Sequence, residues 1–164
     1  MSHRFEAPFI DKLLGDSEQR HGVMTTEQLK DAVARDLEAL LNTRVALAAD
    51  ILNGYPNTAS SVLTYGMRDF ADLCITSTED QKIVCAELKL AIERHEPRLI
   101  NVTAAIRIHR TPSLRVQILI EGTLKAARAS GAIRFNANLK PWSQQYSVKH
   151  AHAVNDFSVE GKAS

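Results

Sequence analysis

Residues 101–120 read NVTAAIRIHRTPSLRVQILI and carry the clearest structural signal in this 164-residue chain. Apolar side chains occupy every second position on both sides of Pro112, and a period of two is typical of β-strands with one buried face. The Thr-Pro-Ser turn between the two runs predicts a β-hairpin. A third run with the same period covers residues 133–140 and ends at Pro141. We therefore predict a C-terminal antiparallel sheet of about three strands, whose apolar face needs helices to cover it.

Two amphipathic helices are predicted before this sheet. The first follows Thr25, which forms a capping-box pattern with Gln28, and carries leucine and valine at spacings of three and four as far as Asn42. The second begins near Thr78 and ends before Pro97, because proline lacks a backbone donor and disfavours helical geometry in the preceding residue. Its expected inner stripe contains Ile83, Val84, Leu88, Ala91, Ile92 and His95. The predicted fold class is α+β, with two main amphipathic helices packed on the C-terminal antiparallel sheet.

Length and composition indicate one domain, since 45% of the residues are apolar and 24% are charged. We expect a partly mobile N-terminal segment over residues 1–24 and an α+β domain over residues 25–141. Residues 61–66, between the two helices, are interpreted as an ordered loop or a short strand. The C-terminal tail, residues 142–164, contains a run at 144–148 that could add one strand. One hydrophobic core is therefore expected.

Charge is distributed unevenly along the chain. Residues 1–100 carry 11 basic and 16 acidic side chains, whereas residues 101–164 carry 9 basic and 3 acidic ones, a net charge of +6. A basic C-terminal region favours an acidic partner, although a solvated basic surface is the simpler interpretation. The N-terminus has no apolar signal-peptide core, and no uncharged apolar stretch of about 18 residues occurs. We therefore expect a cytoplasmic protein that does not insert directly into a membrane.

Metal and cofactor chemistry is not expected from this sequence. Cys74 and Cys85 lie 11 residues apart without neighbouring ligands at zinc-site spacing, so we interpret them as reduced thiols. His150 and His152 are interpreted as solvated side chains. No glycine-rich phosphate loop, nucleophile elbow or dinucleotide fingerprint occurs. The prediction is therefore no cofactor and no metal.

Paired carboxylates are candidates for acid and base catalysis. Glu79 and Asp80 occupy the first turn of the second predicted helix, where acidic side chains stabilise the positive end of the helix dipole. Glu93 with Glu96 is a second pair on the same helix. The dipole interpretation is favoured for the first pair, and we assign no catalytic residue.

Three stretches together resemble one family: DLEALLNTR at residues 36–44, SVLTYGMRDF at residues 61–70 and EPRL at residues 96–99. In this order, and followed by basic strands, they resemble the TssE baseplate subunit of bacterial type VI secretion. TssE is a relative of the phage baseplate wedge proteins, which have also been described as lysozyme-like. The resemblance covers roughly residues 8–140. It implies a small α+β structural subunit, not an enzyme, assembled in the baseplate at the cytosolic face of the inner membrane.

The resemblance also implies two contact surfaces. Glu96, Pro97 and Arg98 match the family motif that contacts the core bundle of the wedge, so the expected partners are TssF/TssG-like and TssK-like wedge subunits. The strand region resembles the interlocking-strand domain of the tail sheath, which implies that sheath subunits add to it by strand pairing. The predicted sheath contacts are the basic residues at polar strand positions: Arg107, Arg115, Arg134 and Lys140. Isolated chains could dimerise through the same edge strand.

Simpler interpretations of both surfaces stay open. A surface ion pair between Glu96 and Arg98 would contribute only about 0–1 kcal/mol. Under the docking hypothesis, Arg98→Ala is expected to leave the fold intact and to block assembly. Basic residues on strands also protect sheet edges against aggregation.

Two other functions compete with the baseplate hypothesis. One is a peptidoglycan hydrolase, and the other is an RNA-binding module that uses the basic strands. Phe135 is the only aromatic residue in the three predicted strands, and it falls on the apolar face. Sheets that bind RNA usually present stacking aromatics on the exposed face. We therefore expect protein partners and no nucleic acid.

Overall fold

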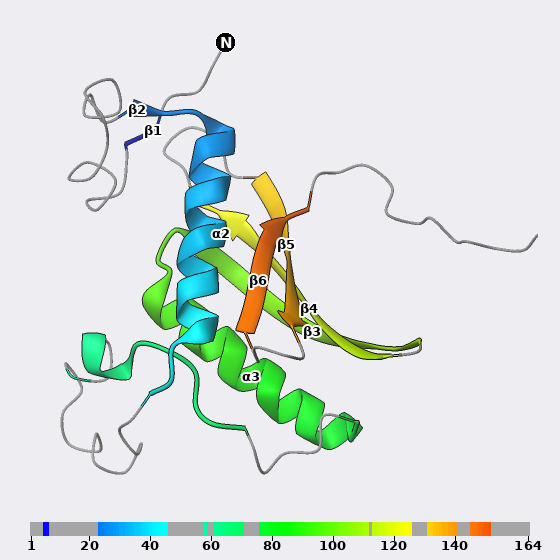
Figure 1. Ribbon diagram of the computed structural model, residues 1–164. Helices are drawn as coiled ribbons and strands as arrows, with labels where there is room; N and C mark the ends of the chain where they lie inside the picture. The colour runs from blue at the N-terminus through cyan, green and yellow to red at the C-terminus, as the bar shows by residue number, and fades with distance from the viewer. Residues whose placement is uncertain are drawn as a thin grey trace, which may run out of the picture.

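A four-stranded antiparallel sheet forms the C-terminal part of the protein, and two helices pack against it (Figure 1). The computed structural model describes residues 5–6, 23–45, 58, 61–70, 76–111, 113–125, 131–140 and 145–151. The helices are α2 (Thr26–Asn42) and α3 (Thr78–His95). The strands lie side by side in chain order: β3 (Leu99–Thr111), β4 (Ser113–Leu124), β5 (Gly131–Lys140) and β6 (Gln145–His150). The predicted α+β class is confirmed, with four strands instead of about three.

Short elements complete the described chain. In the predicted N-terminal segment, β1 (Phe5–Glu6) pairs with β2 (Val23–Met24) in an antiparallel ladder, and the other residues before Val23 lie outside the described part. A 3₁₀ helix, η4 (Val62–Thr64), lies between α2 and α3. This turn corresponds to the stretch that we interpreted as an ordered loop or a short strand.

Helix α2 begins at the predicted capping box. The backbone amide of Gln28 donates to Thr25 Oγ1 at 3.2 Å, and Gln28 Oε1 accepts from the Thr25 amide at 2.8 Å, so two amides at the helix start are satisfied. The residues that α2 buries against the core are Leu29, Ala32, Val33, Ala34, Leu37, Leu40 and Leu41. Burial of each large apolar side chain stabilises the fold by about 1.5–3 kcal/mol, which holds α2 on the sheet.

Helix α3 begins at Thr78, as predicted, with Ser77 as its N-cap, but it departs from the sequence prediction in its inner stripe. The inner stripe consists of Val84, Leu88 and Ile92, at every fourth position, whereas Ile83 is 46% exposed. Including Ile83 was wrong, because it precedes Val84 by one position and so points about 100° away around the helix. No helix in the described ranges is long and apolar enough to cross a membrane.

The sheet has one buried face and one exposed face. Side chains opposite one another in the register are buried together: Ile118 with Ala137, Ile120 with Phe135, and Ala137 with Val148. Residues 145–148 of the run predicted at 144–148 form part of β6, and Val148 adds to the same core as the central strands. Gln144 lies outside the described part of the chain. The hairpin of β3 and β4 is longer than β5, which pairs only with Gln117–Leu124 of β4. Its end is therefore a two-stranded ribbon that projects from the sheet (Figure 1).

The segment after η4 is fixed to the end of α2 by backbone contacts. The Met67 amide donates to the Thr43 carbonyl at 2.8 Å, and the Val45 amide donates to the Met67 carbonyl at 3.0 Å. Gly66 has φ 120°, a backbone conformation that residues other than glycine rarely adopt. A Cβ at Gly66 would lie 2.7 Å from the Thr43 carbonyl oxygen, so this close approach also requires glycine.

We expect Gly66→Ala to lower the free energy of unfolding by about 1–3 kcal/mol, because it combines an unfavourable φ with a backbone clash. Gly131→Ala is the matched control, since a Cβ there would meet no atom within 4 Å. Urea denaturation followed by circular dichroism measures both variants. Equal stability of the two variants would contradict the role assigned to Gly66.

Candidate interaction surfaces

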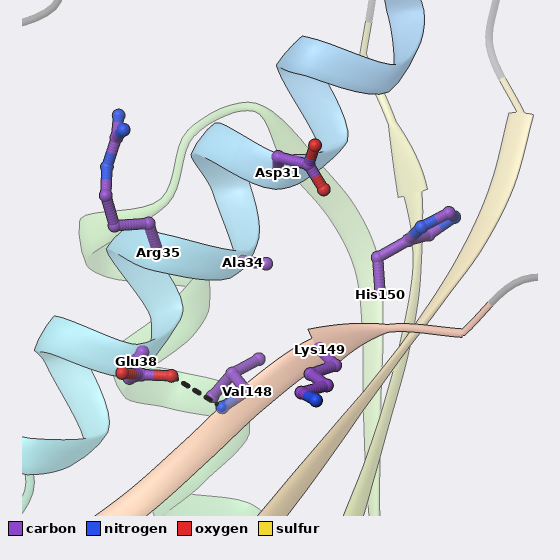
Figure 2. Close-up of a pocket in the computed structure, with 7 residues that line it drawn as sticks. All are labelled: Asp31, Ala34, Arg35, Glu38, Val148, Lys149 and His150. Carbon is purple, nitrogen blue, oxygen red and sulfur yellow. Dashed lines mark hydrogen bonds between the residues drawn. The ribbon is translucent and has the colours of Figure 1, made fainter.

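A shallow groove of about 400 Å³ lies between α2 and β6 (Figure 2). Its lining residues are Asp31, Ala34, Arg35, Glu38, Val148, Lys149 and His150. Glu38 reaches across the groove, and its Oε2 accepts a hydrogen bond from the Val148 amide of β6. Within the ranges that the structure describes, no group of three or more His, Cys, Asp and Glu side chains could hold a metal ion.

The two edges of the sheet differ. Along β6, side chains of α2 bond the backbone groups that face away from β5: Asn42 contacts Tyr146, and Glu38 contacts Val148. Beyond β3, no further strand is present in the described part of the chain. The β3 edge is therefore the one at which a further strand can pair. Its backbone is not wholly free, because Ile106 hydrogen-bonds the Cys85 thiol of α3.

The predicted Glu96-Pro97-Arg98 motif forms the corner between α3 and β3. Glu96 is the C-cap residue of α3, and its amide donates to the Ile92 carbonyl at 2.8 Å. Pro97 follows at an exposed position, where it prevents the helix from continuing. The Leu99 amide donates to the Glu96 carbonyl at 3.0 Å, which turns the chain into β3.

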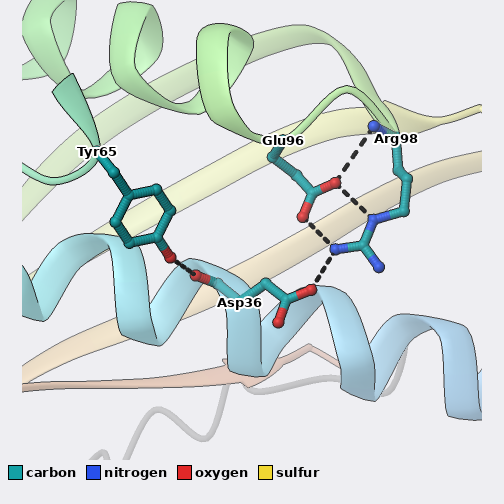
Figure 3. Close-up of polar contacts among 4 residues, drawn as sticks. All are labelled: Asp36, Tyr65, Glu96 and Arg98. Carbon is teal, nitrogen blue, oxygen red and sulfur yellow. Dashed lines mark hydrogen bonds and ion pairs between the residues drawn. The ribbon is translucent and has the colours of Figure 1, made fainter. Parts of the chain in front are cut away.

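Arg98 connects this corner to α2 (Figure 3). Its Nε donates to Glu96 Oε1 at 2.6 Å, and its Nη2 donates to Glu96 Oε2 and to Asp36 Oδ2. The Arg98 backbone amide also donates to Glu96 Oε1, at 3.2 Å. Burial disfavours the charged guanidinium, but the hydrogen bonds and charges of Glu96 and then Asp36 outweigh it and raise the pKa of Arg98 above its usual range.

This ion pair is largely buried. Glu96 is 3% exposed, and the Arg98 side chain is 25% exposed. The simpler interpretation, an ion pair on the surface, is therefore wrong. Both carboxylate oxygens of Glu96 are enclosed and accept hydrogen bonds from Arg98. Arg98 Nη1 is buried too and has no hydrogen-bond partner among the described residues.

The three stretches that carry the family resemblance meet at this junction. The Tyr65 hydroxyl, from the second stretch, donates to the carbonyl of Asp36, from the first, at 3.4 Å. Burial, and then the charges of Asp36 and Glu96, raise the pKa of Tyr65. Next to it, His95 Nε2 lies 2.9 Å from the Thr64 carbonyl, and its ring packs edge-on against Tyr65. Residues far apart in the sequence thus form one contact network.

The predicted sheath contacts lie on the exposed face of the sheet. Arg107, Arg115 and Arg134 are all exposed there, and the first two lie on the hairpin of β3 and β4. Arg134 pairs with Glu121 across β4 and β5. Lys140 is the last residue of β5, and its side chain lies outside the described part.

Lys149 is a basic residue that the sequence analysis missed on this face. It is exposed and lies opposite Asn136, which places it on the same side of the sheet as Arg134. The signal was the alternation of Tyr146, Val148 and His150 with Ser147 and Lys149, which is too short to identify a strand with certainty.

The carboxylates considered for catalysis form ion pairs with basic side chains instead of pairing with one another. Glu79 is exposed at the start of α3 and pairs with Lys82 at 3.2 Å, while Glu93 is exposed and lies 3.9 Å from Lys89. Glu96 differs from both, since it is buried and bonded to Arg98. Of the other residues considered, Cys74 and His152 lie outside the described part, and Cys85 is a half-buried free thiol.

We expect Arg98→Ala to lower the free energy of unfolding by about 3 kcal/mol, because it leaves the buried Glu96 carboxylate without its cation. This value is at the lower end for a broken buried pair, since a quarter of the Arg98 side chain reaches solvent. The earlier expectation that this variant leaves the fold intact has to be revised accordingly. Arg68→Ala is the control, since Arg68 is exposed and lies 3.6 Å from Glu87. Its stability should change by less than about 1 kcal/mol in the same urea titration.

Comparison with known protein families bears on all of these surfaces. Residues 27–129, more than half of the chain, match the family described as baseplate wedge protein gp25. The match spans the three resembling stretches, both helices, β3 and β4. Searches of curated proteins and of solved structures gave no match. The chain belongs to the baseplate wedge protein gp25 family, which is also the family of TssE.

Proposed function

We propose that this protein is a non-enzymatic structural subunit of the baseplate in a bacterial type VI secretion system. In this role it docks to the wedge through the Glu96-Pro97-Arg98 corner and templates sheath assembly by strand pairing. The observation that carries the proposal is the family match over residues 27–129. The three resembling stretches lie within it and contact one another through Asp36, Tyr65, Glu96 and Arg98. The expected partners are TssF/TssG-like and TssK-like wedge subunits and the tail sheath, all at the cytosolic face of the inner membrane.

Geometry at the corner supports wedge docking. Pro97 is exposed on a turn whose conformation is restricted by its ring and by the Arg98 network, so a partner meets a rigid protrusion. Asp36 of α2, which bonds Arg98 at this corner, keeps 42% of its side chain exposed. A partial negative charge at the corner therefore faces solvent, where a basic or hydrogen-bond-donating group of a partner can meet it.

The sheet supports sheath assembly in two ways. The β3 edge offers backbone groups to an added strand, and each new hydrogen bond contributes a net of about 0.5–1.5 kcal/mol. The exposed basic side chains Arg107, Arg115 and Arg134 lie on the adjacent face, where they favour an acidic partner and speed its association. Isolated copies of the chain would dimerise through the same edge.

Wedge docking predicts that Arg98→Ala protein no longer recovers wedge subunits in an affinity pull-down from native cytosol, whereas Arg68→Ala protein recovers them as wild type does. Bound proteins are identified by mass spectrometry, with circular dichroism showing that each bait is folded. Gly66→Ala serves as the stability control, because it is expected to be destabilised while the side chains of Glu96, Pro97 and Arg98 are unchanged. If folded Arg98→Ala protein recovers wedge subunits as well as wild type does, the docking role is ruled out. If Gly66→Ala protein recovers as few wedge subunits as Arg98→Ala protein, lower stability explains the loss of binding.

Sheath pairing predicts that Arg115→Glu weakens binding to purified sheath subunits by at least about tenfold, because a like charge would then face the acidic partner. Lys82→Glu is the matched charge reversal outside the strands, on α3, where the side chain is 70% exposed. It should leave the affinity unchanged. Binding is measured by biolayer interferometry at low and high salt. Similar affinities for both variants would show that the basic face does not contact the sheath.

A further inference from the structure

The Asn42 side chain bonds the edge of β6 as a neighbouring strand would. Asn42 Nδ2 donates to the Tyr146 carbonyl at 2.9 Å, and the Tyr146 amide donates to Asn42 Oδ1 at 2.8 Å. Two residues that face each other in an antiparallel ladder exchange the same pair of hydrogen bonds. The primary amide of Asn42 thus takes the place of a peptide group from an added strand.

Glu38 continues this pattern along the strand. Its Oε2 accepts a hydrogen bond from the Val148 amide at 2.8 Å (Figure 2). Glu38 and Asn42 are four residues apart, so they lie on one side of α2, separated by about 6 Å along the helix axis. Tyr146 and Val148 are two residues apart on a strand, a distance of about 6.8 Å. The near match of the two spacings lets one helix reach successive outward amides of the edge strand.

From this geometry we infer that Glu38 and Asn42 form an edge cap, which closes β6 to pairing with a strand from a second copy of this chain. An uncapped edge strand with unpaired amides is a template for self-association. The cap occupies the outward amides of Tyr146 and Val148, so a strand can join only after α2 side chains give way. The cap acts within a single chain and does not depend on the proposed function. One consequence rests on the proposed function: if β6 is closed, sheath subunits can add a strand only at the β3 edge.

The test uses two double variants. The cap variant carries both Glu38→Ala and Asn42→Ala, and the control variant carries the same two types of substitution at other positions, Glu93→Ala and Asn138→Ala. Glu93 is exposed on α3, and Asn138 is exposed on β5 opposite Ser147, on the side of β6 away from the cap, so neither bonds the outward amides of Tyr146 and Val148. Sedimentation velocity over a range of concentrations gives the state of association of each purified protein. We expect the cap variant to form larger species than wild type at equal concentration, while the control matches wild type. An unchanged sedimentation profile of the folded cap variant would overturn the inference.

Amide hydrogen exchange keeps the test decisive if the double variant does not fold. Glu38→Gln retains an oxygen acceptor for the Val148 amide, whereas Glu38→Ala removes it. We expect exchange at Val148 to be at least tenfold faster in Glu38→Ala than in Glu38→Gln, and the Glu38→Gln rate to stay near that of wild type. Equal exchange in the two single variants would show that Glu38 does not protect the edge. Both experiments use the purified chain alone, so their outcome is separate from that of the pull-down and sheath-binding tests.

Discussion

A buried carboxylate destabilises a fold unless a cation and hydrogen bonds compensate it, and Glu96 is such a carboxylate, 3% exposed at the end of α3. Arg98 provides the cation from two residues further along the chain. Since the same guanidinium also bonds Asp36, one side chain holds α2, the end of α3 and the start of β3 in a single arrangement. The apolar core holds the helices on the sheet, and this network fixes how the corner at Pro97 is set against α2.

The sheet built on that junction has faces and edges with different properties. Its inner face joins the core with α2 and α3, and its outer face is basic. One edge is covered by hydrogen bonds from Glu38 and Asn42, whereas no strand beyond the other, β3, is found in the described ranges. A protein that pairs with partners through a strand benefits from this asymmetry, because two open edges would allow copies of the chain to polymerise. α2 therefore stabilises the core through its leucines and protects an edge through its polar side chains.

Much of this architecture was predictable from the sequence, and the failures have physical causes. Both helices follow capping residues and apolar stripes, and three strands follow runs with a period of two. Ile83 was misplaced because neighbouring apolar residues do not reveal which of them faces the core. Strand β6 was uncertain because its run of alternating residues is short, and its place in the sheet depends on tertiary pairing with β5. Of the proposed interaction surfaces, the motif residues were chosen by resemblance, but the burial of Glu96 was not foreseen.

The sequence by itself determined the class of fold, the order of its elements and the basic character of the C-terminal strands, because capping, periodicity and charge are local properties of the chain. The tertiary structure alone decided that Arg98 bonds Asp36, 62 residues away, and that Asn42 bonds Tyr146, 104 residues away. Such contacts depend on how helices and strands pack, and side chains of the same type occur at many other positions. The difference between a surface motif and a buried junction, and between an open and a capped edge, therefore becomes visible only in the folded chain.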